Sequence, residues 1–341
     1  MKPRPEHYSL WQYLLFTAAL LGAMCLCVCM GSVPIPLSDT LCALRAALAG
    51  QPKEGLAATI LSVRLPRVLC VALSGAALSL AGACMQGLLR NPLADGSTLG
   101  VSSGAALGAV IAIAFGITFP SLPFAGTTVL ASAFAFLSLL LSLALAYRLD
   151  YSLSTNTIIL IGVIYSMFVS SAMSVIVTFA SDRLKSITFW TMGSLQGTGY
   201  KDALLLAAAL VLCGTVLCLH TRELNAFAVG EDNARTIGVN VRRTKLVVLI
   251  AVSVLIGVCV SIGGTIGFVG LVTPHMVRML TGPNHKRLLP ASMFAGAIFL
   301  LLADLAARTV LSPLELPIGV VTSLVGAVVF IFIFYQTRKE R

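Results

Sequence analysis

Charged residues are scarce in this sequence. They make up 11% of its 341 residues, whereas hydrophobic residues make up 58%. An average soluble domain is about 25% charged and about 45–50% apolar, so this composition does not fit a soluble globule. The apolar runs also continue from one end of the chain to the other. We therefore expect a single membrane domain over residues 1–341.

Acidic residues and histidines are rarer still, at 13 and 4 respectively, and the middles of the apolar runs contain almost no acid. Transporters driven by an ion gradient usually keep carboxylates or histidines inside their spans as proton or cation sites. Asp304 lies close to the end of a run, and His275 follows Pro274, where a packed histidine at a helix kink is the commoner case. The sequence therefore disfavours an ion-coupled secondary transporter.

A nucleotide site is also missing. No Gly-Lys pair occurs anywhere in the chain, so the glycine-rich phosphate loop with its lysine cannot be formed. The nine cysteines are scattered, and no set of His, Cys and carboxylate groups converges as a membrane enzyme would require. We expect no catalytic residue, no metal site and no cofactor in this chain. Energy for a pump would have to come from a partner.

Long hydrophobic runs are what the sequence has in abundance. A hydrocarbon layer about 30 Å thick takes about 20 apolar residues per helix, with about 17–25 tolerated. Helices are favoured because backbone groups in lipid must be paired within the segment. We predict an all-α polytopic membrane protein with about ten transmembrane helices, at residues 14–30, 61–85, 100–119, 126–147, 156–179, 203–219, 246–262, 265–280, 290–306 and 316–335.

Basic residues favour one side of this predicted bundle. With ten spans both tails lie on one side, which collects fifteen of the 23 Lys and Arg residues, against eight on the other. Cytoplasmic loops carry the excess of Lys and Arg, so both termini are predicted to be cytoplasmic. Orientation accounts for the net charge of +10, and no nucleic-acid partner is needed.

The main loop on the predicted cytoplasmic side, residues 220–245, has the pattern of two short helices. Residues 224–229 fit the first helix, Gly230 breaks it, and residues 231–237 fit the second, with Gly238 as its C-cap. Two helices that meet at a glycine would make a rigid knob. Such a knob suits an energy-supplying partner, although an ordinary structured loop is the alternative.

The second of these helices has a charge pattern of its own. Glu231 and Asp232 lie at its N-terminal end, where negative charge suits the helix dipole. Arg235 follows Glu231 by four residues, the spacing at which opposite charges stabilise a helix. We expect these two side chains to interact.

Hydroxyl groups recur along the fifth apolar run, at Ser166, Ser170, Ser174 and Thr178. A polar stripe of this length can line a water-accessible route. Serine within a helix can also donate to the carbonyl four residues earlier and pack against a neighbour. Both interpretations stay open at this point.

Arg64, Arg67 and Arg308 all fall on the side that holds fewer basic residues, so orientation does not explain them. They can lie at the membrane edge and pair with lipid phosphates or with Glu315. Alternatively they can receive carboxylates of an external partner, because the planar guanidinium holds a carboxylate bidentately.

Six ordered motifs resemble the FecCD family of ABC importer permeases, the type II importers of iron-siderophores, haem and cobalamin. The resemblance extends from about residue 60 to residue 327. The matching segments are Arg64-Leu65-Pro66-Arg67; Gly82 to Gln86 with Arg90-Asn91-Pro92-Leu93-Ala94 and Leu99 to Gly104; Trp190-Thr191-Met192-Gly193; Gly230-Glu231 through Gly238; Gly267 to Leu271 with Pro274-His275; and Leu316-Pro317-Ile318-Gly319.

This resemblance implies the type II ABC importer permease fold, with ten helices per subunit and a dimer around a central pathway. The second permease subunit would be another copy or a related chain. Two cytoplasmic ABC ATPase subunits, which bind ATP and magnesium, would drive transport, and an extracytoplasmic substrate-binding protein would deliver the cargo. The implied location is the bacterial cytoplasmic membrane, and the chain itself would not be an enzyme.

The resemblance also implies roles for particular residues. The fifth and tenth helices would line the route. ATPase coupling is implied for Leu224, Asn225, Gly230, Glu231, Ala234, Arg235 and Gly238; binding-protein docking for Arg64, Arg67 and Arg308; a cytoplasmic gate for Ser154, Thr155 and Asn156; and pathway lining for Ser166, Ser170 and Ser174. An iron(III)-siderophore is the expected cargo because it is the family's commonest, with haem and cobalamin as alternatives.

Overall fold

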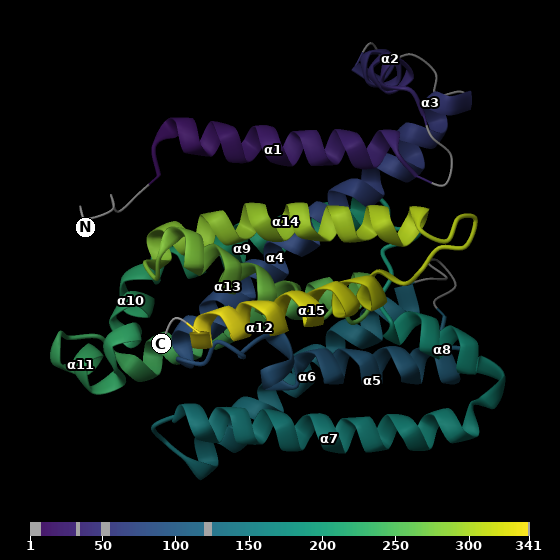
Figure 1. Ribbon diagram of the computed structural model, residues 1–341. Helices are drawn as coiled ribbons and strands as arrows, with labels where there is room; N and C mark the ends of the chain where they lie inside the picture. Colours follow the sequence, from purple (N-terminus) through teal and green to yellow (C-terminus); the bar gives the residue numbers. More distant parts are fainter. Residues whose placement is uncertain (1–7, 32–34, 49–54, 119–124, 340–341) are drawn as a thin grey trace.

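The structure, a computed structural model, describes residues 8–31, 35–48, 55–118 and 125–339. Every regular element within these ranges is helical, and they contain no strand. Figure 1 shows the long helices side by side in one bundle. The all-α polytopic fold expected from the sequence is confirmed.

Seven spans among the described residues are long and apolar enough to cross a membrane. They are α1 (Leu10–Cys29), the continuous segment of α3 (Gly55–Thr59), a π-helical turn (Ile60–Arg64) and α4 (Leu65–Leu88), then α6 (Ala125–Leu149), α7 (Thr155–Phe179), α9 (Tyr200–Leu219), α12 (Val241–Gly263) and α14 (His285–Thr309). The three other predicted runs correspond to α5 (Val101–Ala114), α13 (Val269–Thr281) and α15 (Ile318–Lys339).

Shorter elements lie between these helices. They are α2 (Leu37–Leu48), α8 (Leu184–Thr191), α10 (Thr221–Val229), α11 (Glu231–Thr236) and two 3-10 turns, Gly96–Leu99 and Ser181–Arg183. The first described residues of α1, the last of α15, and α10 with α11 share one end of the bundle, whereas α2 and α8 lie at the other end (Figure 1). We call these the knob end and the far end.

Several predicted boundaries differ from the structure by a few residues, and one of these differences has a clear cause in the backbone. The run expected at 265–280 begins only at Val269, because Gly264 and Phe268 both have left-handed backbone, with φ of 67° and 66°. A residue in this conformation cannot continue a right-handed helix. The gap is held from outside, since the Thr265 hydroxyl donates to the Thr191 carbonyl. The chain therefore breaks between α12 and α13 inside the bundle.

Helix α4 lies at the centre of the bundle. In its most apolar window 83% of the residues are buried, and it packs against α9, α12, α13 and α14. Two glycines make this possible: a Cβ on Gly75 would collide with the Gly296 carbonyl, and a Cβ on Gly82 with the Gly270 carbonyl. Small residues at such contacts let helix backbones approach where lipid provides no hydrophobic drive.

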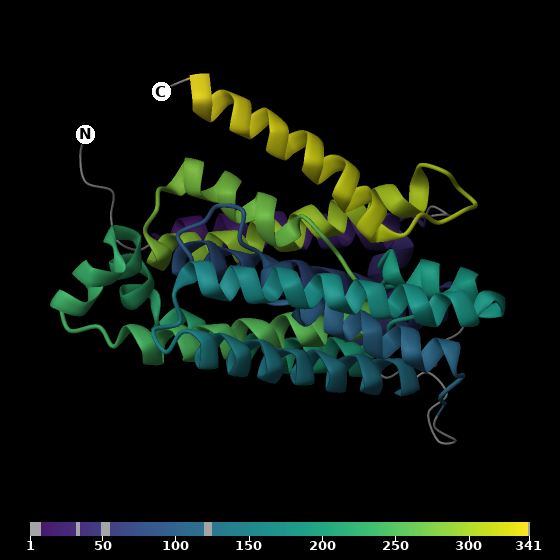
Figure 2. The same cartoon turned by 90° about the horizontal axis from the view of Figure 1, so that it is seen from below.

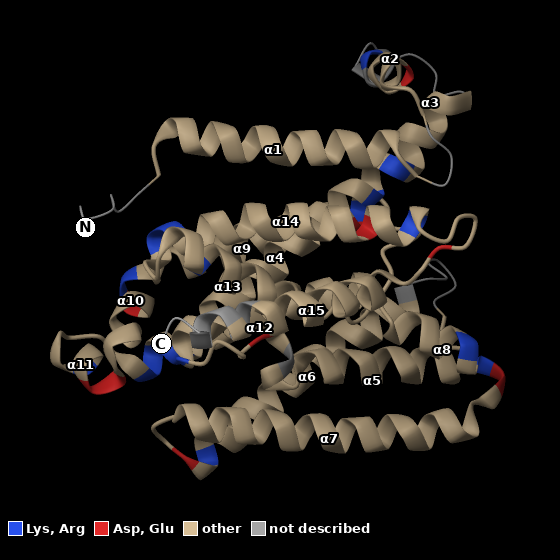
Figure 3. Ribbon diagram, in the orientation of Figure 1, with Lys and Arg blue, Asp and Glu red and all other residues tan. Residues whose placement is uncertain are grey.

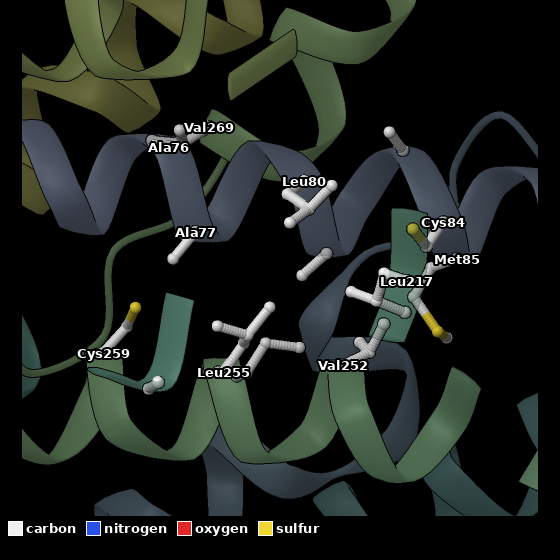
Figure 4. Close-up of a cluster of buried hydrophobic side chains, with 14 of the residues drawn as sticks. Ala76, Ala77, Leu80, Cys84, Met85, Leu217, Val252, Leu255, Cys259 and Val269 are labelled. Atoms are coloured by element: carbon white, nitrogen blue, oxygen red, sulfur yellow. The ribbon is translucent and has the colours of Figure 1, made fainter. Parts of the chain in front are cut away.

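The core on the other side of α4 is apolar. Leu80, Cys84 and Met85 point towards α9 and α12 (Figure 4), where Leu217 and Leu255 meet them. All five side chains are at most 1% exposed. Cysteine here fills a small apolar space, as it does in other interiors.

Charged residues gather towards the two ends of the bundle, and few lie in its middle (Figure 3). This pattern is the one that a bilayer imposes, because a charge at its centre is costly. Some helices bury little of their surface within the single chain, and α1 has only 11% of its apolar window buried. Only 22% of the apolar window of α7 is buried, and α15 leans away from the body towards its C-terminal end (Figure 2).

Replacing Gly82 by Leu should destabilise the fold by about 3 kcal/mol or more, because the new side chain would meet backbone that cannot move aside. Thermal unfolding of the purified protein in detergent measures this. Gly22→Leu is the matched control, since a Cβ at Gly22 meets nothing within 4 Å. Equal stability of the two variants would contradict the close packing of α4 against α13.

Candidate functional site

The predicted knob is present at one end of the bundle. Helices α10 and α11 meet at Gly230, whose φ of 135° is open to glycine but strained for other residues. The second helix ends at Thr236, one residue before the predicted end, and Gly238 follows with φ of 88°. The expected pair of short helices broken by glycine is confirmed. We keep the name knob for residues 221–238.

The first half of the knob is fixed to α14. Leu224 and Phe227 are fully buried. The Asn225 side chain donates to Asn284 Oδ1 at 3.0 Å and accepts the backbone N–H of His285 at 2.8 Å. Because Asn284 is the N-cap of α14, α10 is bonded directly to the first turn of that helix.

The second half of the knob is fixed differently, and one expectation about it was wrong. Glu231 pairs with Lys245 of α12, with Oε1 and Nζ 2.6 Å apart, and the partner of Arg235 is Asp232 at 3.8 Å. The geometry favours Lys245 because its side chain is fully buried, whereas the Arg235 side chain is 54% exposed. Ala234, also fully buried, packs α11 onto the bundle.

The predicted gate residues lie against this half of the knob. Ser154 is the N-cap of α7, and its hydroxyl accepts the N–H of Thr157. The Thr155 hydroxyl lies 3.5 Å from Glu231 Oε1. Asn156 is exposed. Two groups of residues that the sequence separates by about 75 positions are therefore brought together.

A tight turn precedes these gate residues. Asp150 accepts the N–H groups of Ser152 and Ser154 at 2.9 and 3.0 Å. Hydrogen bonds from Ser152 and Ser154 hold the pKa of Asp150 well below its usual range. Leu153, fully buried, has left-handed backbone with φ of 54°. The turn thus keeps an apolar residue in an unfavourable conformation.

Helix α7 presents the hydroxyl stripe. Ser174 and Thr178 donate to the carbonyls four residues earlier, at 3.0 and 2.8 Å, and Ser170 is exposed. The Ser166 side-chain oxygen is buried and has no hydrogen-bond partner. Ser170 and Ser174 border a cavity of about 310 Å³ shared with Met173, α5 and α8. Pathway lining stays a prediction for these three serines.

The three predicted docking arginines lie together at the far end. We call Arg64, Arg67, Asp304, Arg308 and Glu315 the arginine cluster. Asp304, with a side chain 1% exposed, lies 2.9 Å from both Arg67 and Arg308, and Arg67 also pairs with Glu315 at 2.9 Å. A buried carboxylate between two guanidinium groups neutralises much of their charge.

The same cluster holds the end of α1. Arg64 donates to the Val28 carbonyl at 2.8 Å, and Arg308 donates to the Cys27 and Met30 carbonyls at 3.1 and 3.4 Å. These carbonyls lie at the C-terminal end of α1, where cations are favoured. The arginines therefore have internal partners, and docking of an external protein stays a prediction.

Two partners of the predicted site residues, Lys245 and Asp304, were not predicted from the sequence. Lys245 appears in the sequence as one of three basic residues near the start of an apolar run, and nothing in the spacing ties it to Glu231. Asp304 was expected only to lie close to the end of the predicted run 290–306; its four-residue spacing from Arg308 is the signal that could have indicated the pair.

Comparison with known proteins gives this geometry its context. The family model of the FecCD transport family matches residues 19–336. The chain belongs to this family of ABC importer permeases. The FecCD chain is 45% identical over 280 residues to the uncharacterized ABC transporter permease protein YvrB of Bacillus subtilis, covering 82% of this chain and 79% of that protein.

Two other relatives of this FecCD chain carry cargo in their names. The cobalamin import system permease protein BtuC of Halobacterium salinarum is 39% identical, with 82% of this chain and 74% of the relative covered. The hemin transport system permease protein HmuU of Yersinia pestis is 38% identical, with 82% and 84% covered.

A solved structure shares the fold of the FecCD chain. It is described as an inward-facing conformation of a metal-chelate type ABC transporter. The TM-score is 0.82 at 32% sequence identity, and the match covers 95% of this chain and 98% of that one. The expected resemblance to type II importer permeases is confirmed.

Replacing Asp304 by Asn should lower the free energy of unfolding by about 3–5 kcal/mol, because two largely buried guanidinium groups lose their shared carboxylate. Glu315→Gln is the matched control. Its side chain is 26% exposed, so its loss should cost about 1 kcal/mol or less. Thermal unfolding in detergent compares the stability of the two variants. If Asp304→Asn loses less stability than Glu315→Gln, Asp304 is not the residue that stabilises the far end of the bundle.

Proposed function

We propose that this chain forms the transmembrane pathway of an ATP-driven importer for a metal chelate, with an iron(III)-siderophore complex as the expected cargo. The observation that carries the proposal is the knob, an element without a nucleotide site that is bonded both to α14 and to the residues that begin α7. A rigid surface element of this kind suits a separate ATPase.

The partners follow from family membership and from the exposed helices. Each of the two ABC ATPase subunits would seat on the knob of one permease subunit, and a substrate-binding protein would deliver cargo at the far end. A second permease subunit, another copy or a related chain, would cover α7 and α15, which bury little within one chain. The chain itself would hydrolyse nothing.

Both termini and the knob are proposed to face the cytoplasm of a bacterial cell. The distribution of Lys and Arg supports this orientation. The knob also lies at the same end of the bundle as the start of α1 and the end of α15 (Figure 1). An even number of spans requires both termini to lie on one side, so this grouping supports the proposed orientation.

The metal-chelate class is supported by the relatives and by the solved structure, whose names include cobalamin, hemin and metal chelate. All three are bulky organic ligands around a metal ion. Within this class the iron-siderophore is preferred as the commonest cargo of the family, and haem or cobalamin is the alternative. An ion-coupled secondary transporter is the weaker second candidate.

Reconstituted in liposomes with its ATPase and binding protein, the chain should transport a ferric siderophore only when ATP is present on the side of the membrane that holds the ATPase. The isolated chain should hydrolyse no ATP. Radioactive iron uptake and phosphate release measure these outcomes, with haem and cobalamin tested in parallel as cargo. Uptake that persists without the ATPase but collapses with the ion gradient would contradict the proposal.

The docking prediction is best tested at Arg64, which is half-buried and pairs with backbone carbonyls. Arg64→Glu should slow capture of the loaded binding protein about tenfold, and the difference should shrink as salt is raised, because rim charges act mainly on the association rate. Arg45→Glu, on the exposed surface of α2, is the control. Unchanged association kinetics in folded Arg64→Glu protein would leave Arg64 a structural residue only.

A further inference from the structure

A single lysine connects the knob to the turn that begins α7. The Lys245 ammonium group donates to Glu231 Oε1 at 2.6 Å and to the Leu153 carbonyl at 2.7 Å. Glu231 is the first residue of α11, and Leu153 directly precedes the N-cap of α7. Lys245 itself lies in the second turn of α12. Three helices therefore meet at one nitrogen atom.

The environment of this lysine makes its contacts specific. Its side chain is fully buried, and a buried ammonium is stable only when it is paired and hydrogen-bonded. Glu231 remains 25% exposed, so the carboxylate could find solvent if α11 moved away. The buried Lys245 ammonium group cannot reach solvent in this way. If α11 moves, the lysine side chain must move with Glu231 or lose the ion pair.

The turn on the other side of the lysine is held in a strained form. Leu153 has left-handed backbone, with φ of 54°, although it is neither glycine nor asparagine. Such a conformation persists only where the surroundings impose it. The hydrogen bond from Lys245 to the Leu153 carbonyl is one of the contacts that impose it.

The two halves of the knob differ in what they touch. Helix α10 is bonded to the first turn of α14 through Asn225, whereas α11 is bonded to α12 and the start of α7. Gly230 joins the two halves, and its φ of 135° is one that other residues adopt only with strain. A push on α11 can thus reach α7 without moving α14.

Arg242 holds the same turn from another side. Its guanidinium group lies 4.0 Å from the centre of the Tyr151 ring and 4.6 Å from that of Tyr147. Among the described contacts, these link α12 with the turn through Tyr151 and with the end of α6 through Tyr147, but not with α11. Arg242 is therefore a fixed brace, whereas Lys245 is shared between the turn and the knob.

We infer that Lys245 is a positioning residue for transport: its ion pair with Glu231 transmits movement of α11 to residues 150–156 and so couples the ATPase to the gate at the start of α7. This inference rests on the proposed function. It predicts a phenotype different from loss of ATPase association. When the Lys245–Glu231 pair is broken, the ATPase should still associate with the permease and hydrolyse ATP.

The test uses the complete transporter, with ATPase and binding protein, carrying Lys245→Met. ATPase co-purification should stay within about twofold of the unmodified complex, while imported cargo per ATP hydrolysed should fall at least tenfold. Arg243→Met, an exposed residue on the same helix, removes an equal charge and should leave this ratio unchanged. A second variant, Glu231→Gln with Lys245→Met, leaves no unpaired charge and should show the same uncoupling.

A direct readout of the gate separates coupling from simple loss of structure. With Asn156→Cys as a probe, labelling by a membrane-impermeant maleimide, above that of the parent chain, should change between nucleotide-free and ATP-plus-vanadate states. The change should vanish with Lys245→Met and persist with Arg243→Met. Persistence with Lys245→Met, or failure of both lysine variants to assemble, would overturn the inference. Absence of ATP-dependent uptake by the unmodified complex would instead overturn the proposed function.

Discussion

The close approach of α4 to its neighbours is the constraint on which the rest of the structure depends. Its backbone meets that of α14 at Gly75 and that of α13 at Gly82. In lipid there is no hydrophobic driving force for apolar helices to associate, so their association relies on such close backbone contact and on van der Waals packing. Once α4 is fixed, α13 and α14 are fixed too, and with them both charged ends of the bundle.

Those two ends solve the same electrostatic problem in the same way. At the knob end a buried ammonium group, Lys245, is shared between a carboxylate and the Leu153 carbonyl. At the far end a buried guanidinium group, Arg308, is shared between Asp304 and the carbonyls that end α1. A charge removed from water needs both a counter-ion and hydrogen bonds. In each case the hydrogen bonds go to carbonyls at a helix end or in a turn, so the charge also pairs backbone groups that the helix itself leaves free.

What could be predicted from the sequence was what depends on neighbours along the chain. The spans follow from run length, and the knob follows from Gly230 with its flanking helix formers. The break between the predicted runs 246–262 and 265–280 was expected, but its extension to Phe268 was not, because a left-handed backbone at a phenylalanine is not indicated by the residues around it. The partner of Glu231 was assigned by helical spacing to Arg235, whereas the buried Lys245 has it. A buried lysine forms a stronger ion pair with Glu231 than an exposed arginine at the favoured helical spacing. Which basic residue is buried depends on the fold, so the sequence alone does not show it.

Helix α1 is attached in an unequal way. Only 11% of its apolar window is buried, yet the carbonyls at its C-terminal end are held by Arg64 and Arg308. On the uncovered face of α1 selection can then act mainly on hydropathy and span length, and substitutions among apolar residues should accumulate there more freely than on the face that packs through Phe16 against Phe294. At the last turn of α1, by contrast, the backbone carbonyls accept hydrogen bonds from Arg64 and Arg308. A change in the turn or in either arginine therefore removes a partner of the other. Divergence between related chains should accordingly be fast along α1 and slow at its end.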